Sequence, residues 1–178
     1  LDLYKKEMNK TVEEFYRNNK IPNQEVYCRM IITRGVGEIG FSQSCVKTPT
    51  QFIIIVKPLP EWAEEKFNQG LHLKVVTRFR NHPKALDPAM KSGNYLNSIL
   101  AYLEAEEEDQ TIDDALLCNF EGFVTEGTTF NVFYVKKGVI VTSPLDIGIL
   151  DGITRKLVIQ LANDLEIPVR ETYFTKKH

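Results

Sequence analysis

The stretch that decides the fold is Phe123-Val124-Thr125-Glu126-Gly127-Thr128-Thr129-Phe130-Asn131, followed later by Leu150-Asp151-Gly152-Ile153-Thr154-Arg155. The first run places one carboxylate, that of Glu126, at the end of a β-rich segment, with small hydroxyl residues beside it. The second run opens an amphipathic helix with Gly-Ile-Thr. Upstream, Met90-Lys91-Ser92-Gly93-Asn94-Tyr95-Leu96 places Lys91 at the entrance to another helix. The sequence therefore offers an amine, a carboxylate and a helix N-terminus at separate element ends.

These three features are what a protein needs to hold pyridoxal phosphate. Lys91 would form the Schiff base, Glu126 would pair with the pyridine nitrogen, and N–H groups near Gly152 would take the phosphate. Ser92 and Gly93 leave room beside Lys91 for a planar ligand. We expect Lys91 to be buried, because burial keeps an amine neutral and a neutral amine attacks an aldehyde. Glu126 would keep the ring nitrogen protonated and so make the ring an electron sink.

Each feature also has an ordinary structural interpretation. A lone lysine is most often a surface residue, and an isolated carboxylate at a strand end usually points to solvent. Gly152-Ile153-Thr154 is equally consistent with a helix N-cap that carries a hydroxyl. The order and spacing of all three features favour the cofactor site.

A second motif, Gly35-Val36-Gly37-Glu38-Ile39-Gly40, matches the glycine pattern of dinucleotide sites and follows an expected strand. Such a site needs a helix that begins at the glycines. Residues 41–50 are polar, contain Pro49 and lack helical periodicity. The motif therefore indicates a glycine-rich turn.

Composition excludes several classes of partner. The chain has 178 residues, of which 43% are hydrophobic, and a net charge of −2, so nucleic acid is not an expected partner. No apolar run approaches membrane-spanning length. Cys28, Cys45 and Cys118 lack metal or redox spacing, which suits a reducing compartment and a cytoplasmic location. There is no signal-peptide pattern, although a chain that opens at Leu1 without Met could have lost a targeting segment.

The element pattern predicts a mixed α/β protein. We expect helices over 2–17, ended by Ile21-Pro22-Asn23, over 95–105, and from near Gly152 to Leu165. Strands are expected over 26–33, 51–56, 71–79, 115–118, 130–135 and 139–142, with another that starts at 167–169. The proline-containing segment 58–63 is the expected linker between a small N-terminal domain, 1–57, and a larger cofactor-binding domain, 64–178.

The runs 91–105, 123–133 and 144–155 resemble class IV aminotransferases, the fold-type IV pyridoxal-phosphate enzymes, and the resemblance extends from Val26 to Phe174. It implies a two-domain fold, with a small α/β domain and a larger, pseudo-barrel-like α/β domain. It implies Lys91 as the Schiff-base lysine and Glu126 as the partner of the pyridine nitrogen. The remaining implied roles are the 3-hydroxyl contact for Tyr95, phosphate contacts for Ile153 and Thr154, and structural positions for Asn131 and Arg155.

Within this family, Tyr27-Cys28-Arg29 resembles the Tyr-x-Arg of branched-chain amino acid aminotransferases. The resemblance implies that Tyr27 borders the substrate pocket and that Arg29 meets the side-chain carboxylate of glutamate. The D-amino acid branch carries an Arg-x-His in the next loop, where this chain has Ile39-Gly40-Phe41. The aminodeoxychorismate lyase branch typically lacks the Glu-Gly-Thr and Gly-Ile-Thr forms. For Tyr27 and Arg29 the alternative is simple strand alternation toward solvent.

The resemblance implies transamination of branched-chain L-amino acids with 2-oxoglutarate/glutamate, by a homodimer. Relative to the family pattern, the sequence is expected to be incomplete at both ends, without a phosphate-binding arginine at the start and a threonine-containing turn at the end. Two alternatives stay open. One is a transaminase of D-amino acids or other amines, and the other is a non-catalytic binding domain that keeps the scaffold.

Overall fold

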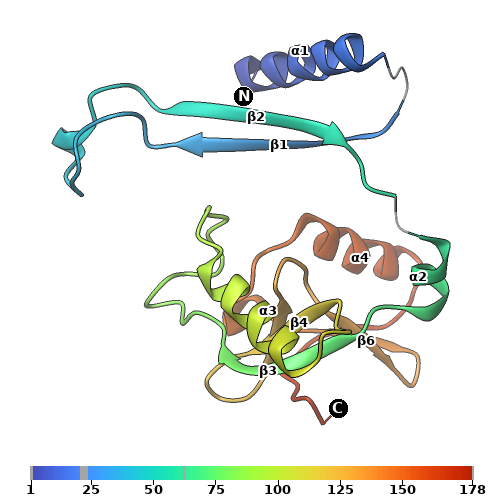
Figure 1. Cartoon of the computed structure of the whole chain (residues 1–178). Helices are drawn as coiled ribbons and strands as arrows, with labels where there is room; N and C mark the ends of the chain where they lie inside the picture. The colour runs from blue at the N-terminus through green and yellow to red at the C-terminus, as the bar shows by residue number, and fades with distance from the viewer. Residues whose placement is uncertain (1, 21–23, 62, 178) are drawn as a thin grey trace. The chain divides into compact units, whose positions relative to one another are not determined.

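The computed structural model describes residues 2–20, 24–61 and 63–177 (Figure 1). The chain divides into two compact units, Leu1–Phe67 and Asn68–His178. Trp62, within the expected linker 58–63, lies outside the described residues, and the linker assignment stays a prediction. A short helix, α2 (Glu64–Gln69), follows this segment. The sequence pattern does not predict α2, because six residues are too few to show helical periodicity.

In the first unit, helix α1 (Asp2–Asn19) packs on an antiparallel pair of strands, β1 (Val26–Thr33) and β2 (Gln51–Pro58). All three elements are confirmed, while the expected helix end at 21–23 lies outside the described residues. Burial alternates along β2: Phe52, Ile54 and Val56 are half-buried, and the residues between them are exposed. The ring of Tyr4 in α1 meets that of Phe52 at 5.2 Å, so this face of the sheet is the one that α1 covers.

The glycine-rich segment 35–40 lies in the loop between β1 and β2. Arg34 donates hydrogen bonds from its guanidinium to the carbonyls of Gly40 and Phe41, both at 3.2 Å, which holds the loop together. The next element is η1 (Gln43–Cys45), a three-residue 3-10 turn. The helix that a dinucleotide site requires therefore does not begin at these glycines.

In the second unit, strands β3 (Leu73–Phe79), β4 (Asp114–Cys118) and β5 (Val124–Gly127) form one sheet. β3 and β4 are parallel, so the chain must cross over between them, and helix α3 (Leu96–Glu108) is that crossover. β5 returns antiparallel to β4. The buried residues between α3 and the sheet are Val76, Ala101, Ala105, Ile112, Ala115 and Leu117. This sheet and α3 position the residues of the candidate site.

A second sheet contains β6 (Phe133–Lys136), β7 (Val139–Thr142) and β8 (Val169–Glu171). The predicted hairpin turn is confirmed: Lys137 and Gly138 have φ values of 52° and 78°, as a two-residue turn between twisted strands requires. β7 and β8 are parallel, with the 3-10 turn η2 (Leu145–Ile147) and helix α4 (Ile153–Asp164) in the crossover between them. A second cluster of buried apolar residues in this unit contains Cys118, Val124, Val141 and Phe174.

Two details of the second unit differ from the sequence-based expectation. The strand expected over 130–135 begins only at Phe133, because residues 127–130 form a tight turn. The helix predicted from near Gly152 to Leu165 is amphipathic, yet its apolar residues Leu157, Leu161 and Leu165 are 51%, 49% and 69% exposed. Within 2–20, 24–61 and 63–177, no helix is both long enough and apolar enough to span a membrane.

Candidate active site

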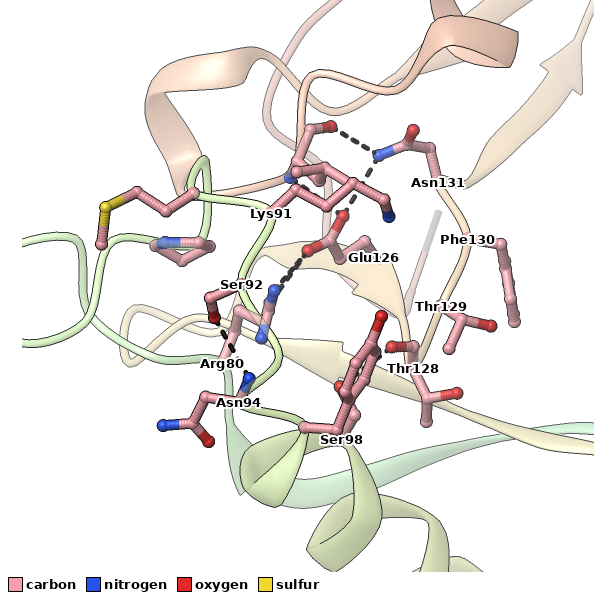
Figure 2. A pocket seen from close by; sticks show the side chains of 14 residues that line it. Arg80, Lys91, Ser92, Asn94, Ser98, Glu126, Thr128, Thr129, Phe130 and Asn131 are labelled. Atoms are coloured by element: carbon pink, nitrogen blue, oxygen red, sulfur yellow. Dashed lines mark hydrogen bonds and ion pairs between the residues drawn. The ribbon is translucent and has the colours of Figure 1, made fainter. Parts of the chain in front are cut away.

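A cavity of about 100 Å³ opens in the second unit, where the end of β3, the loop before α3 and the turn after β5 meet (Figure 2). Its lining residues are Arg80, Pro88, Met90, Lys91, Ser92, Asn94, Tyr95, Ser98, Glu126, Thr128, Thr129, Phe130, Asn131 and Leu150. The structure therefore brings together three of the site residues expected from the sequence, Lys91, Tyr95 and Glu126.

Glu126 is the buried charge of this cavity, with 4% of its surface exposed. Arg80 donates from Nε to Glu126 Oε1 at 2.9 Å, and its Nη2 lies 2.8 Å from the same oxygen in an ion pair. The other oxygen, Oε2, accepts from Asn131 Nδ2 at 3.2 Å and from the backbone N–H of Leu150 at 3.1 Å. Figure 2 shows the carboxylate between Arg80 and Asn131. Three hydrogen bonds and an ion pair from three parts of the chain thus fix its position.

Opposing effects set the charge of Glu126. Burial raises its pKa above the usual value, while the charge of Arg80 and the hydrogen bond from Leu150 partly offset that rise. The ammonium of Lys91 also acts to lower the pKa of Glu126. All three hydrogen-bonding partners are donors, Arg80 Nη2 adds an ion pair, and a protonated carboxyl would lose part of its accepting capacity. The surroundings of Glu126 are therefore built for a carboxylate anion.

The turn after β5 explains the Glu-Gly-Thr-Thr-Phe spacing. The N–H of Gly127 bonds to the carbonyl of Phe130 at 2.8 Å, and Glu126 forms an isolated bridge with Asn131. A Cβ on Gly127 would lie 2.3 Å from the ring of Phe130, so any larger residue there would force this ring to move. Thr128 is held from two sides, since its hydroxyl donates to Asp114 at 2.7 Å and its carbonyl accepts from Ser98 at 2.9 Å. The turn thus presents a fixed wall to the cavity.

Lys91 lines the cavity but is exposed, so the expectation that it would be buried is wrong for this structure. The physical reason is its position in an irregular loop at the rim, where its backbone belongs to no helix or strand. Tyr95 follows it as the N-cap residue of α3 and is half-buried. Side-chain oxygens of Ser92 and Asn94 accept from backbone N–H groups two residues on, at 3.3 Å and 3.2 Å, which shapes the segment between Lys91 and the helix.

The expected phosphate site at the start of α4 lies next to the cavity's wall, but Ile153 and Thr154 are not among the lining residues. Both are exposed, and the N-cap residue is Gly152, so no side chain caps the helix at this position. Asn131 connects the two places: it donates to the carbonyl of Leu150 at 3.0 Å, and a Cβ on Gly152 would lie 2.1 Å from its Oδ1. The phosphate roles of Ile153 and Thr154 stay predictions.

Arg155, the end of the second motif, lies away from the cavity in the protein interior. It is 3% exposed, donates to the carbonyl of Ser143 at 2.8 Å and pairs with Glu171 on β8. These contacts join α4 to the second sheet, which supports the structural position that the resemblance implies for Arg155.

Tyr27 and Arg29 belong to the first unit, on the face of β1 opposite to the one that α1 covers. Tyr27 lies across from Lys57, whose ammonium is 5.2 Å from the centre of the tyrosine ring. Arg29 lies across from Ile55, which is 43% exposed. The two residues share one strand face, as their spacing predicts. Their role in substrate binding stays a prediction.

No pattern in the sequence identifies Arg80 as a site residue. Arg80 contacts Glu126 46 residues away, and no local pattern reports such a pair. The available signal was a cationic residue at the carboxyl end of a buried strand, next to a segment that carries a candidate lysine. Asn131 is only five residues from Glu126, and their contact depends on the turn after β5, which brings the chain back beside Glu126.

Comparisons with known proteins point to one family. The family model described as amino-transferase class IV matches residues 1–178. A Methanocaldococcus jannaschii protein, named provisionally as a branched-chain-amino-acid aminotransferase, is 40% identical over 175 residues, which are 98% of this chain and 58% of that protein. The Thermoproteus uzoniensis branched-chain aminotransferase, solved with norvaline, superposes with a TM-score of 0.81 at 34% identity over 97% of this chain and 56% of that one.

A third similar protein is the T.th. branched-chain amino acid aminotransferase complexed with N-(5'-phosphopyridoxyl)-L-glutamate. Its TM-score is 0.76 at 29% identity, over 97% of this chain and 54% of that one. The chain thus spans little more than half the length of these relatives. The expected fold class, a mixed α/β fold of the class IV type, is confirmed. With a family match over its whole length, the chain belongs to the class IV aminotransferases.

Proposed function

We propose that the protein transaminates branched-chain L-amino acids with 2-oxoglutarate/glutamate and uses pyridoxal phosphate. The observation that carries the proposal is the buried Glu126, held by three N–H donors and an ion pair with Arg80 at a cavity that Lys91 and Tyr95 also line. The names of the relatives support the branched-chain substrate class, and the phosphopyridoxyl-glutamate adduct supports both the cofactor and glutamate.

The groups around the cavity fit pyridoxal phosphate in their chemistry. A cofactor of this kind offers an aldehyde, a basic ring nitrogen, a phenolic hydroxyl and a phosphate. Lys91 supplies an amine, Glu126 an anionic acceptor, and Tyr95 a hydroxyl from the same loop–helix segment. The N-terminus of α4, with the N–H groups of Ile153 and Thr154, supplies anion donors beside the cavity wall.

When bound, pyridoxal phosphate supplies an aldehyde that exchanges amines and a ring that takes up electrons from Cα. Lys91 Nζ would hold the cofactor through that aldehyde between turnovers. Once released by the incoming amine, Nζ would carry the proton that leaves the substrate Cα. Glu126 would keep a proton on the ring nitrogen, and Arg80 and Asn131 would keep Glu126 in place.

The remaining parts of the proposal concern the whole protein. Tyr27 would border the substrate pocket, and Arg29 would meet the side-chain carboxylate of glutamate. Segment 58–63 would link the domain that carries these residues to the cofactor-binding domain. We further propose a homodimer in the cytoplasm. A transaminase of D-amino acids or other amines is the alternative that a substrate panel would reveal.

Covalent labelling tests the proposal. Pyridoxal phosphate is added to the full-length protein, borohydride fixes the cofactor to the amine that holds it, and peptide mapping locates the modified lysine. We expect Lys91 to carry the label, and Lys91→Ala to lose both the label and nearly all turnover. Lys84→Ala, a change to an exposed lysine of the same loop, is the matched control and should keep both.

Modification at Lys74 or Lys84 in place of Lys91 would show that the lysine assignment is wrong. A well-folded protein that takes no label at any lysine would favour the non-catalytic binding domain. Labelling at Lys91 with turnover of D-alanine but not of L-leucine would keep the cofactor site and overturn the branched-chain assignment.

A further inference from the structure

Asn97, the second residue of α3, makes a set of contacts that the roles above do not use. Its Oδ1 accepts from Arg80 Nη1 and from the backbone N–H of Asn81, both at 3.2 Å. Its Nδ2 donates to the carbonyl of Phe79 at 2.9 Å. The Asn97 carboxamide thus hydrogen-bonds to three consecutive residues at the end of β3, to the backbone of Phe79 and Asn81 and to the guanidinium of Arg80 between them.

Arg80 links these contacts to the carboxylate of Glu126. The guanidinium is planar and rigid, so a bond at Nη1 restricts the direction of Nε and Nη2. Those two nitrogens are the ones that bind Glu126 Oε1, at 2.9 Å and 2.8 Å. Asn97 is also two residues after Tyr95 on the segment that carries Lys91. The side-chain amide of Asn97 therefore connects the segment that carries Lys91, through Arg80, to the buried carboxylate of Glu126.

We infer that Asn97 is a positioning residue for Glu126: it sets the orientation of Arg80, and Arg80 holds Glu126 as the anion that faces the cofactor ring. This inference deepens the proposed function, since it rests on Glu126 as the partner of the ring nitrogen. Asn97 does not line the cavity, so it acts through Arg80 and not by contact with a ligand.

The chemistry of the site requires an amide at position 97. One end must accept, because it faces two N–H donors, and the other must donate, because it faces a carbonyl. Aspartate has the same shape but would place an oxygen against the Phe79 carbonyl. It would also offer Arg80 a second carboxylate that competes with Glu126. Alanine would remove the contacts without adding a charge.

The test compares Asn97→Asp and Asn97→Ala with the wild type, in the full-length protein. The control is Asn163→Asp, which makes the same chemical change at an exposed residue of α4. The first readout is the ¹³C NMR titration of Glu126, assigned by its loss in Glu126→Gln, without added cofactor. Arg80 and Lys91 are charged groups that act on this carboxylate, and neither residue is substituted in the variants.

We expect the pKa of Glu126 to rise further in Asn97→Asp, and to a lesser extent in Asn97→Ala, because Arg80 is drawn away or released. The control should titrate as the wild type does. The second readout is kinetic: kcat should fall by about tenfold or more, the size usual for an outer partner of an active-site ligand, while KM for leucine changes little.

A Glu126 titration that is unchanged in both folded Asn97 variants would overturn the inference, and so would equal losses in kcat and KM with no change in the titration. If Asn97→Asp does not fold, Asn97→Ala decides alone. The NMR readout needs no turnover, so it is independent of the proposed function. If borohydride labelling fails in the wild type but the titration shifts as expected, the enzyme proposal fails and the positioning role stands.

Discussion

At the scale of single residues, the chemistry proposed for the cavity depends on the contacts that favour a charged Glu126. Burial raises the pKa of this carboxyl, and Arg80 and the N–H of Leu150 work against that rise. An uncompensated buried carboxylate would be protonated or expelled. Three hydrogen bonds to the two carboxylate oxygens and an ion pair with Arg80 solve this problem and also fix the direction of the side chain.

Glu126→Gln keeps the size of the side chain and removes its charge. We expect pyridoxal phosphate still to bind, while proton abstraction from the substrate slows by several orders of magnitude, about 3–5 kcal/mol of barrier. The measurement is single-turnover absorbance in the visible range. Glu107→Gln, at an exposed position on α3, is the control and should react as the wild type does. Near-normal rates in a well-folded Glu126→Gln variant would disprove the electronic role.

At the scale of elements, the carboxylate of Glu104 joins α3 to β3. Glu104 Oε1 accepts from both the backbone N–H and the hydroxyl of Thr77, each at 2.6 Å, and Glu104 pairs with Arg78 at 3.6 Å. Burial acts to raise the pKa of Glu104, but the hydrogen bonds from Thr77 and Arg78 and the charge of Arg78 outweigh it and lower the pKa. Because α3 follows Lys91 and Tyr95, this contact also supports the candidate site.

A lowered pKa in the folded state fixes the sign of the pH dependence of stability. The contribution of Glu104 is present above its unfolded pKa, close to 4.5, and is lost as the pH falls through the lower folded value. Glu104→Gln should therefore reduce the free energy of unfolding at pH 7 by about 1 kcal/mol, and by less at low pH. Urea denaturation across this pH range is the measurement. An equal loss at every pH, or an equal loss in Glu107→Gln, would contradict it.

At the scale of the whole molecule, substrate choice is predicted to depend on the first unit. Tyr27 and Arg29 share an exposed face of β1 with apolar neighbours such as Ile55 on β2. A pocket that serves both leucine and glutamate needs an apolar wall and a cation for the longer acidic side chain. This face offers both kinds of group.

Arg29→Ala should reduce kcat/KM for glutamate much more than for leucine. A charge-assisted contact contributes roughly 1.5–3 kcal/mol, which is about a ten- to hundredfold loss for glutamate. Both substrates are measured on the same variant, with Arg17→Ala at the exposed end of α1 as the control. Equal losses for the two substrates would mean that Arg29 supports the fold and does not select the substrate.

Local patterns in the chain were enough to predict most of the elements and the chemical groups of the site. Runs of β-branched and apolar residues indicated β1 and β2, and Lys137-Gly138 indicated the hairpin turn, because these patterns depend on neighbours in the chain. The motif around Glu126 and the segment that begins at Lys91 identified the family, which the comparisons bear out. Helix α2 was missed because it is too short for a periodic signal.

Which groups meet is set by packing in three dimensions. Arg80 and Glu126 are 46 residues apart and come together because β4 pairs with both β3 and β5, an arrangement that no local pattern reports. The exposure of Lys91 and the link from Asn97 to Arg80 likewise depend on how a loop and a helix end pack on that sheet. Periodicity and turn preference act over a few residues, whereas the environment of a buried charge is set by every element that packs around it.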